Sequence, residues 1–227
     1  MAKDITWTIL TDGRKDLIER TIPSWEQNVA GQFNGKFIID DSGDPGYREW
    51  LAKTFKNFEI VPVKKQRSGY INAMRKVFEV ARSNGNPYIF HLEDDFVLNK
   101  PVNLNDLSHV LDKKNYLTQI SLLRQPWYEV EIEAGGVLQV FIKQRKRIYA
   151  KRMGDKQWLE HRFFWTCNPS VFPLWVAERE WPKGGFSEAK FGMELFENPD
   201  LWSGVWGRLN TPYYIEHIGS YQNGGSY

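Results

Sequence analysis

Three consecutive carboxylates, Glu93, Asp94 and Asp95, follow the apolar stretch YIFHL at residues 88–92. Burying adjacent like charges without a partner is costly, so we expect another group to compensate them. Mn²⁺ and Mg²⁺ prefer oxygen ligands, and one or two carboxylates together with water and phosphate oxygens complete a metal–diphosphate site. The simpler alternative is a set of solvated acids at a strand end, and the three residues alone favour neither interpretation.

The first half of the chain must position these acids, and its apolar residues alternate between strand-like and helix-like spacing. Strands and helices that alternate with short connections predict an α/β fold with a mostly parallel sheet and helices on both faces. Pro23 is expected to kink or divide the first helix. The predicted strands are residues 5–10, 36–40, 58–63 and 88–92, and the predicted helices are 15–29, 47–55 and 68–82.

Polar residues follow the other predicted strands as well. Thr11 and Asp12 come after the first strand, and Asp40 and Asp41 come after the second. In such sheets, ligands bind beyond the carboxyl ends of the strands. We therefore expect these residues to share one rim of the sheet with residues 93–95.

The second half is less regular. Apolar runs predict strands at 117–123, 137–143, 161–166 and 213–218, and a short helix at 187–196. Trp202 and Trp206 lie in a glycine- and serine-containing segment. This composition suits a wall against which a ring-shaped ligand stacks.

The most basic run of the chain is KQRKRIYAKR at residues 143–152. As a solvated hairpin or a flap, the run needs no partner. As a phosphate-binding surface, it would suit a DNA ligand.

Composition limits the class of protein. The chain has 227 residues, 41% of them hydrophobic, which is enough to bury a core. A net charge of +2, from 30 basic and 28 acidic residues, argues against binding nucleic acid by charge alone. Cys167 is the only cysteine, so no intrachain disulfide can form. Without a signal-like stretch or a long apolar segment, we expect a cytoplasmic protein without membrane insertion.

Taken in order, these segments resemble the GT-A-fold glycosyltransferases of the broad family-2-like group. The resemblance implies an α/β, Rossmann-like domain over residues 1–227, with a nucleotide-binding half at 1–100 and a smaller mixed acceptor-binding half at 101–227. The segments that carry it are TDGR at 11–14, FIIDDSGD at 37–44, the helix after Arg67-Ser68-Gly69, HLEDDF at 91–96 and EHIG at 216–219.

The resemblance also implies roles for the residues of these segments. Asp95 would bind Mn²⁺ or Mg²⁺, with His217 joining the metal shell, and Glu93 and Asp94 would reach the ribose or bound water. Asp40 or Asp41 would hydrogen-bond the base or the ribose of a nucleotide-sugar donor, which we expect to be UDP-linked. The remaining residues expected to contact the donor are Thr11, Asp12, Arg14, Arg67 and Gly69.

Inverting sugar transfer needs a carboxylate that takes the proton of the acceptor hydroxyl while the metal stabilises the departing diphosphate. In the family this base follows a glycine-containing loop, here within GGFSEAKFGMELFE at 184–197. Glu188 and Glu194 both qualify, and Glu194 is preferred because it follows Phe191-Gly192. The acceptor would be a glycan, a protein or a modified DNA base, and the oligomeric state is left open.

Two other functions are compatible with the resemblance. A sugar-phosphate nucleotidyltransferase would need a glycine-rich loop after the first strand, and TDGRKD is poor in glycine. An inactive relative that only binds glycans or nucleotides would not need Asp95, Glu194 and His217 together.

Overall fold

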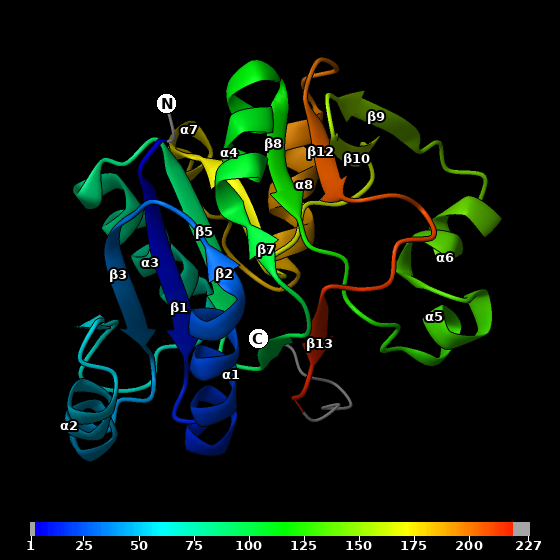
Figure 1. Cartoon of the computed structure of the whole chain (residues 1–227). Coiled ribbons are helices and arrows are strands. Elements are labelled where there is room, and N and C mark those ends of the chain that lie inside the picture. Colours follow the sequence, from blue (N-terminus) through cyan, green and yellow to red (C-terminus); the bar gives the residue numbers. More distant parts are fainter. Residues whose placement is uncertain (1–2, 220–227) are drawn as a thin grey trace.

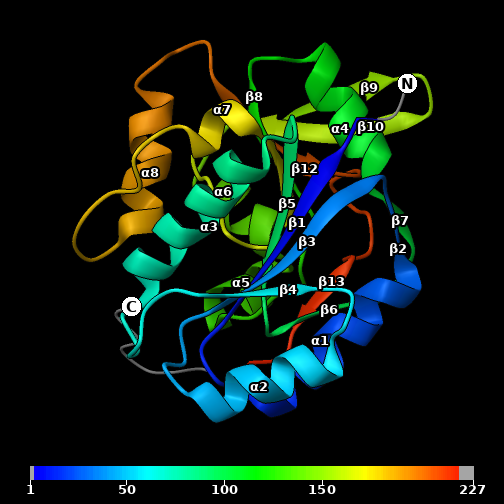
Figure 2. The same cartoon turned by 90° about the vertical axis from the view of Figure 1, so that its left-hand side faces the viewer.

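The computed structural model describes residues 3–219 and contains one nine-stranded mixed sheet with helices on both faces (Figures 1 and 2). The strand order is β4-β3-β1-β5-β11-β8-β12-β10-β9. The strands are β1 (Ile5–Thr11), β3 (Phe33–Asp40), β4 (Glu59–Pro62), β5 (Tyr88–Glu93), β8 (Leu117–Ser121), β9 (Tyr149–Met153), β10 (Lys156–His161), β11 (Ser170–Pro173) and β12 (Trp202–Trp206).

The remaining strands form two small pairs, β2 (Val29–Ala30) with β7 (Val102–Asn103) and β6 (Phe96–Leu98) with β13 (Ile215–His217). The helices are α1 (Lys15–Asn28), α2 (Pro45–Thr54), α3 (Tyr70–Asn84), α4 (Leu104–Lys113), α5 (Glu129–Ala134), α6 (Val137–Lys143), α7 (Leu174–Ala177) and α8 (Ser187–Phe196). Among the described residues, no helix is long and apolar enough to cross a membrane.

The first half of the fold is the predicted parallel sheet. β3 pairs with β1 and with β4, and β1 pairs with β5, all in parallel. Side chains of β1 alternate between two hydrophobic clusters: Trp7 and Ile9 pack with α1, α2 and α4, whereas Leu10 packs with α3 and α8. The two clusters therefore lie on opposite faces of the sheet, in agreement with the arrangement of helices in Figure 2.

α1 is not divided at Pro23, which lies inside the helix on its exposed side. Ile18, Ile22 and Trp25 are fully buried on the other side. Water can therefore satisfy the carbonyl group that the proline leaves free, while the buried face holds the helix in place.

Two predictions for the second half are wrong. Residues 137–143 form helix α6, because a short apolar run does not by itself distinguish a strand from a helix. The predicted strand at 161–166 is also absent, since β10 ends at His161 and an irregular segment follows. In contrast, the predicted short helix at 187–196 is confirmed as α8.

The basic run at 143–152 covers the end of α6, a turn, and most of β9, which forms an antiparallel hairpin with β10 at the edge of the sheet. β13 confirms the centre of the predicted strand at 213–218 and pairs antiparallel with β6, so that His217 lies opposite Phe96. A residue near the end of the chain is thereby brought beside the acids at the end of β5.

Candidate functional site

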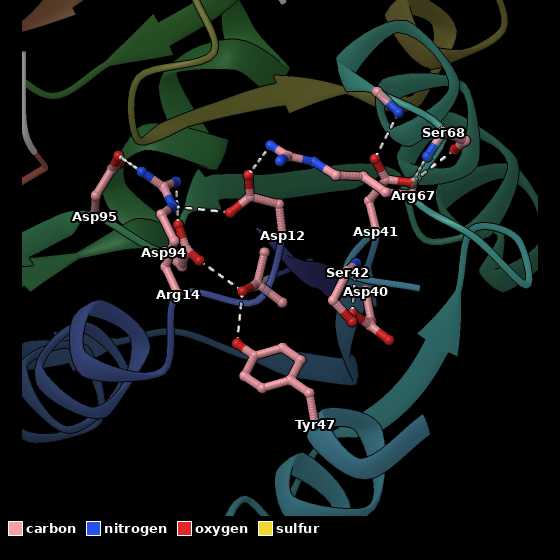
Figure 3. A network of polar contacts seen from close by, with 12 residues as sticks. Asp12, Arg14, Asp40, Asp41, Ser42, Tyr47, Arg67, Ser68, Asp94 and Asp95 are labelled. Carbon is pink, nitrogen blue, oxygen red and sulfur yellow. Dashed lines mark hydrogen bonds and ion pairs between the residues drawn. The ribbon is translucent and has the colours of Figure 1, made fainter. Parts of the chain in front are cut away.

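The carboxyl ends of β3, β1 and β5 lie side by side, as predicted. In the parallel register, Thr11 is the partner of Asp40, and Leu10 is the partner of Glu93. The acidic residues that follow these strands therefore meet at one rim, together with Arg14 and Arg67 (Figure 3).

Arg14 supplies a positive charge to the buried acids. Its guanidinium group forms ion pairs with Asp95 at 2.6 Å, with Asp12 at 3.0 Å and with Asp94. Burial by itself would lower the pKa of Arg14, but the three carboxylates raise it above its ordinary value. Arg14, which directly precedes α1, therefore neutralises part of the negative charge of these buried acids.

The acids at the end of β5 differ in pKa. Burial raises the pKa of Asp94 to about 7, although Arg14 opposes the shift. Burial also acts to raise the pKa of Asp95, but hydrogen bonding to His217 and the charge of Arg14 outweigh it and lower the value. Glu93 has a pKa well above its ordinary value because it is buried beside Asp95 and Glu188.

Asp94 is held by a chain of hydroxyl groups. Thr11 Oγ1 donates to Asp94 Oδ2 at 2.6 Å, and Tyr47 OH lies 2.7 Å from the same Thr11 oxygen. Because the single Thr11 hydrogen is given to the carboxylate, Tyr47 is the donor of the second bond. Thr11 and Asp94, both predicted to contact the donor, are thus buried and bonded to each other.

Asp40 and Asp41 each hold a loop. Asp40 accepts hydrogen bonds from the Ser42 backbone and from Arg48, both at 2.9 Å. Asp41 accepts from Ser68 Oγ at 2.6 Å and from the backbone N–H groups of Ser68 and Gly69. Asp41 therefore fixes the segment that leads into α3, where Gly69 has a positive φ of 81°.

A small pocket lies among these residues, with a volume of about 30 Å³. The ion pair between Arg67 and Asp12 lies at this pocket, and the Arg67 side chain is 58% exposed. Exposed ion pairs contribute little free energy, so Arg67 can move away at small cost. The lining residues are Leu10, Thr11, Asp12, Arg14, Asp41, Arg67, Gly69, Tyr70, Ala73 and Glu93, which include seven of the residues predicted to contact the donor.

Asp95 and His217 provide two unused ligand atoms. His217 Nε2 lies 3.3 Å from Asp95 Oδ2, whereas Asp95 Oδ1 and His217 Nδ1 are buried and have no hydrogen-bond partner among residues 3–219. A carboxylate oxygen and an imidazole nitrogen are atom types that suit Mn²⁺, so the chemistry of these two residues fits the metal that the resemblance implies. Within residues 3–219 no group of three or more acidic, histidine or cysteine side chains could hold a metal, so the other ligands would be water and phosphate oxygens.

Gln125 holds His217 in this position, and no feature of the sequence indicated it. Gln125 Nε2 donates to the His217 carbonyl at 3.0 Å, and the His217 N–H donates to Gln125 Oε1 at 2.8 Å. The ring centroids of Trp127 and Phe96 lie 4.2 Å and 4.8 Å from that of His217. The imidazole ring is therefore packed from two sides.

The two candidate bases on α8 have different surroundings. Glu188 is partly buried in the first turn, and Tyr70 OH donates to its carboxylate at 3.2 Å. Burial raises the pKa of Glu188, while hydrogen bonds from Thr166, Tyr70 and Cys167 oppose the shift. Glu194 is exposed and makes no hydrogen bond or ion pair with the residues that the structure describes.

Replacing Arg14 with methionine is expected to lower the free energy of unfolding by about 3–5 kcal/mol, because it leaves buried carboxylates without their cation. The loss should shrink as the pH falls from 8 to 5, since Asp94, whose pKa burial raises to about 7, then takes up a proton and loses its charge. Denaturant unfolding at both pH values measures the effect. Arg67→Met is the matched control and should cost less than about 0.5 kcal/mol; an equally small loss for Arg14→Met would contradict the role of Arg14.

Searches by sequence found no matching family model and no matching curated protein. Comparison of the fold did find solved structures. The mannosyltransferase PcManGT from Pyrobaculum calidifontis, in complex with GDP-Man and Mn²⁺, matches 96% of this chain with a TM-score of 0.62 at 11% identity. GalNAc-T7 with UDP, GalNAc and Mn²⁺ matches 99% with a TM-score of 0.67 at 12% identity.

A third match is S. aureus TarS 1–349 in complex with UDP-GlcNAc, with a TM-score of 0.63 at 11% identity over 99% of this chain. The chain covers 57%, 45% and 61% of the lengths of PcManGT, GalNAc-T7 and TarS, respectively. At such low identity, the likeness establishes the fold. The chain therefore has the GT-A fold of these glycosyltransferases over nearly its whole length.

Proposed function

We propose that the protein is a metal-dependent glycosyltransferase that moves a sugar from a nucleotide-sugar donor to an acceptor hydroxyl with inversion. The observation that carries the proposal is the contact between Asp95 and His217, whose Oδ2 and Nε2 atoms lie 3.3 Å apart, next to Arg14, which lines the pocket at the rim. The fold, shared with structures that hold nucleotide sugars or their parts, supports it.

The donor would enter the pocket at the carboxyl ends of β1 and β5. Since the pocket holds about 30 Å³, which is room for about one water molecule, Arg67 must first leave Asp12. Once released, the guanidinium group is free to bind the diphosphate, for which Arg is well suited. Arg14 keeps Asp94 and Asp95 in place throughout, because its nitrogen atoms are directed at the carboxylates.

Asp95 and His217 would hold the metal, and a bound metal would neutralise the negative charge of the departing diphosphate. Since Arg14 already pairs with one oxygen of Asp95, the other oxygen would be the one available to a metal. Catalysis then depends mostly on the positioning of charged groups.

Glu188 is the better candidate for the base. Its carboxylate lies near Glu93 at the rim, and Tyr70, which lines the pocket, donates a hydrogen bond to it. A carboxylate with a raised pKa is a stronger proton acceptor than an ordinary one, which suits removal of the proton from the acceptor hydroxyl. Glu194 stays as the alternative base, which the resemblance favours because it follows Phe191-Gly192.

Thermal unfolding in the presence of UDP-, GDP-, ADP- and TDP-linked sugars tests the proposal. Ligands that bind only the native state raise the melting temperature by mass action. We expect one nucleotide to raise it, and the rise to require Mn²⁺ or Mg²⁺. If no donor raises the melting temperature with or without metal, the transferase proposal fails; a rise that does not depend on metal would contradict the role of Asp95 and His217.

A further inference from the structure

A second pocket, of about 530 Å³, lies far from the acids of the rim. Tyr116, Tyr149, Lys151, Glu160, Asp200 and Trp202 line it. Its volume is in the range that small-molecule sites occupy in proteins.

The strand register places this pocket at the opposite end of the sheet. β8 runs parallel to β5, because each is antiparallel to β11, and β12 runs parallel to β8. Trp202 begins β12 and is paired with Leu117 at the start of β8. The rim acids follow the carboxyl end of β5, whereas Trp202 lies at the amino end of its strand, as the arrowheads in Figure 1 show.

Two aromatic rings form a corner in this pocket. The centroids of Tyr149 and Trp202 lie 5.5 Å apart with an interplanar angle of 76°, and 39% of Tyr149 is exposed. Aromatic rings offer an apolar face with partial negative charge, against which the C–H face of a pyranose ring can pack. Tyr149 lies on the outermost strand, so a ligand reaches this corner from solvent.

Glu160 is a buried carboxylate that the proposed mechanism does not use. It is only 3% exposed, and its Oε1 atom accepts hydrogen bonds of 2.8 Å from Tyr116 OH and from Trp158 Nε1. Its Oε2 atom lies 3.8 Å from Lys151 Nζ, which is beyond hydrogen-bond distance. This oxygen therefore keeps the capacity to accept hydrogen bonds from a ligand.

The pocket carries charges of both signs, which a neutral ligand with hydroxyl groups can match. Glu160 and Asp200 disfavour a phosphate or another anion, and Lys151 disfavours a quaternary ammonium ion. Hydroxyl groups can donate to the Glu160 oxygen and accept from the Lys151 ammonium group. A ring with an apolar face and hydroxyl groups at its edge satisfies both the aromatic corner and the charged groups.

We propose that this pocket is a non-catalytic carbohydrate-binding site, with Tyr149 and Trp202 packing on a neutral pyranose and Glu160 accepting its hydroxyl groups. Binding at this site does not depend on the proposed transferase activity. If the acceptor is a glycan, a second attachment point would raise its effective concentration at the rim.

Fluorine NMR of the full chain labelled with 5-fluorotryptophan tests the site. The probes are the methyl glycosides of glucose, galactose, mannose and N-acetylglucosamine, and a Trp202→Phe variant identifies the Trp202 resonance. We expect at least one glycoside to shift this resonance.

The affinity, measured on the same resonance, should fall about tenfold or more in Tyr149→Ala and in Glu160→Gln, because each variant loses one main contact with the ligand. Tyr213→Ala is the control, since Tyr213 is 43% exposed and does not line the pocket.

The proposal fails if no glycoside shifts the Trp202 resonance, or if Tyr149→Ala binds as well as the unchanged protein. It also fails if tetramethylammonium or inorganic phosphate, but no glycoside, produces the shift. Tyr149 is exposed on an edge strand, so its variant stays informative even if Glu160→Gln does not fold. Donor-induced thermal shifts should be the same in Tyr149→Ala as in the unchanged protein, which separates this test from that of the transferase activity.

Discussion

Replacing Asp95 with asparagine is expected to abolish manganese binding and to lower the rate of sugar transfer about 10³-fold. The amide keeps the shape of the side chain but removes its charge and replaces one carboxylate oxygen with an NH2 group, which does not bind a metal. Electron paramagnetic resonance of free Mn²⁺, with and without the donor nucleotide, measures binding. Transfer, or hydrolysis of the donor found in the thermal screen, measures the rate.

The fold should survive this change, because Arg14 keeps its ion pairs with Asp12 and Asp94. Asp155→Asn is the control: the Asp155 side chain is 90% exposed and, within the part of the chain that the structure describes, pairs only with Lys156, so both metal binding and rate should be unchanged. His217→Ala should weaken manganese binding less than Asp95→Asn, because the charged ligand remains. Normal manganese binding in Asp95→Asn would show that the metal lies elsewhere.

Replacing Glu188 with glutamine is expected to lower transfer by about 10²–10⁴-fold while donor binding stays intact, since a general base acts on the acceptor. Glu194→Gln has the same chemical change on the same helix and serves as the matched control. We expect Glu194→Gln to keep nearly full activity, because this side chain is exposed and unpaired with the described residues. Single-turnover rates, together with donor-induced thermal shifts, separate chemistry from binding.

The pH profile gives a second readout. Because burial raises the pKa of Glu188, the rate should begin to fall with decreasing pH above the range of an ordinary glutamate, as the base becomes protonated. This acid limb should be lost in Glu188→Gln. If Glu194→Gln instead removes transfer and Glu188→Gln retains it, the base is Glu194, and the hydrogen bond from Tyr70 to Glu188 has only a structural role.

The sequence was most informative where local periodicity agrees with tertiary structure. Strands β1, β3, β4 and β5 and helices α1, α2 and α3 lie close to their predicted positions, because the central strands β1 and β5 are apolar and buried and each helix has one apolar side. Parallel strands with short connections can form only a few topologies, so the rim of acids followed from the order of the elements.

The prediction from sequence was wrong where a short apolar run had no periodicity that distinguishes a strand from a helix. The composition of residues 137–143 is compatible with a strand or with a helix. In the structure the segment is a helix that packs against α5. Likewise, Gln125 and Tyr70 became visible as site residues only through the contacts they make with His217 and Glu188.

The sequence by itself determined the α/β class, the rim of acids and most of the residues that line its pocket, because these depend on periodicity and on strand ends. Only the tertiary structure decided that Arg14 neutralises Asp94 and Asp95, that Glu188 and not Glu194 contacts Tyr70, and that Trp202 lies at the far end of the sheet. Each of these depends on side chains from elements far apart in the chain, and sequence order does not specify such distances.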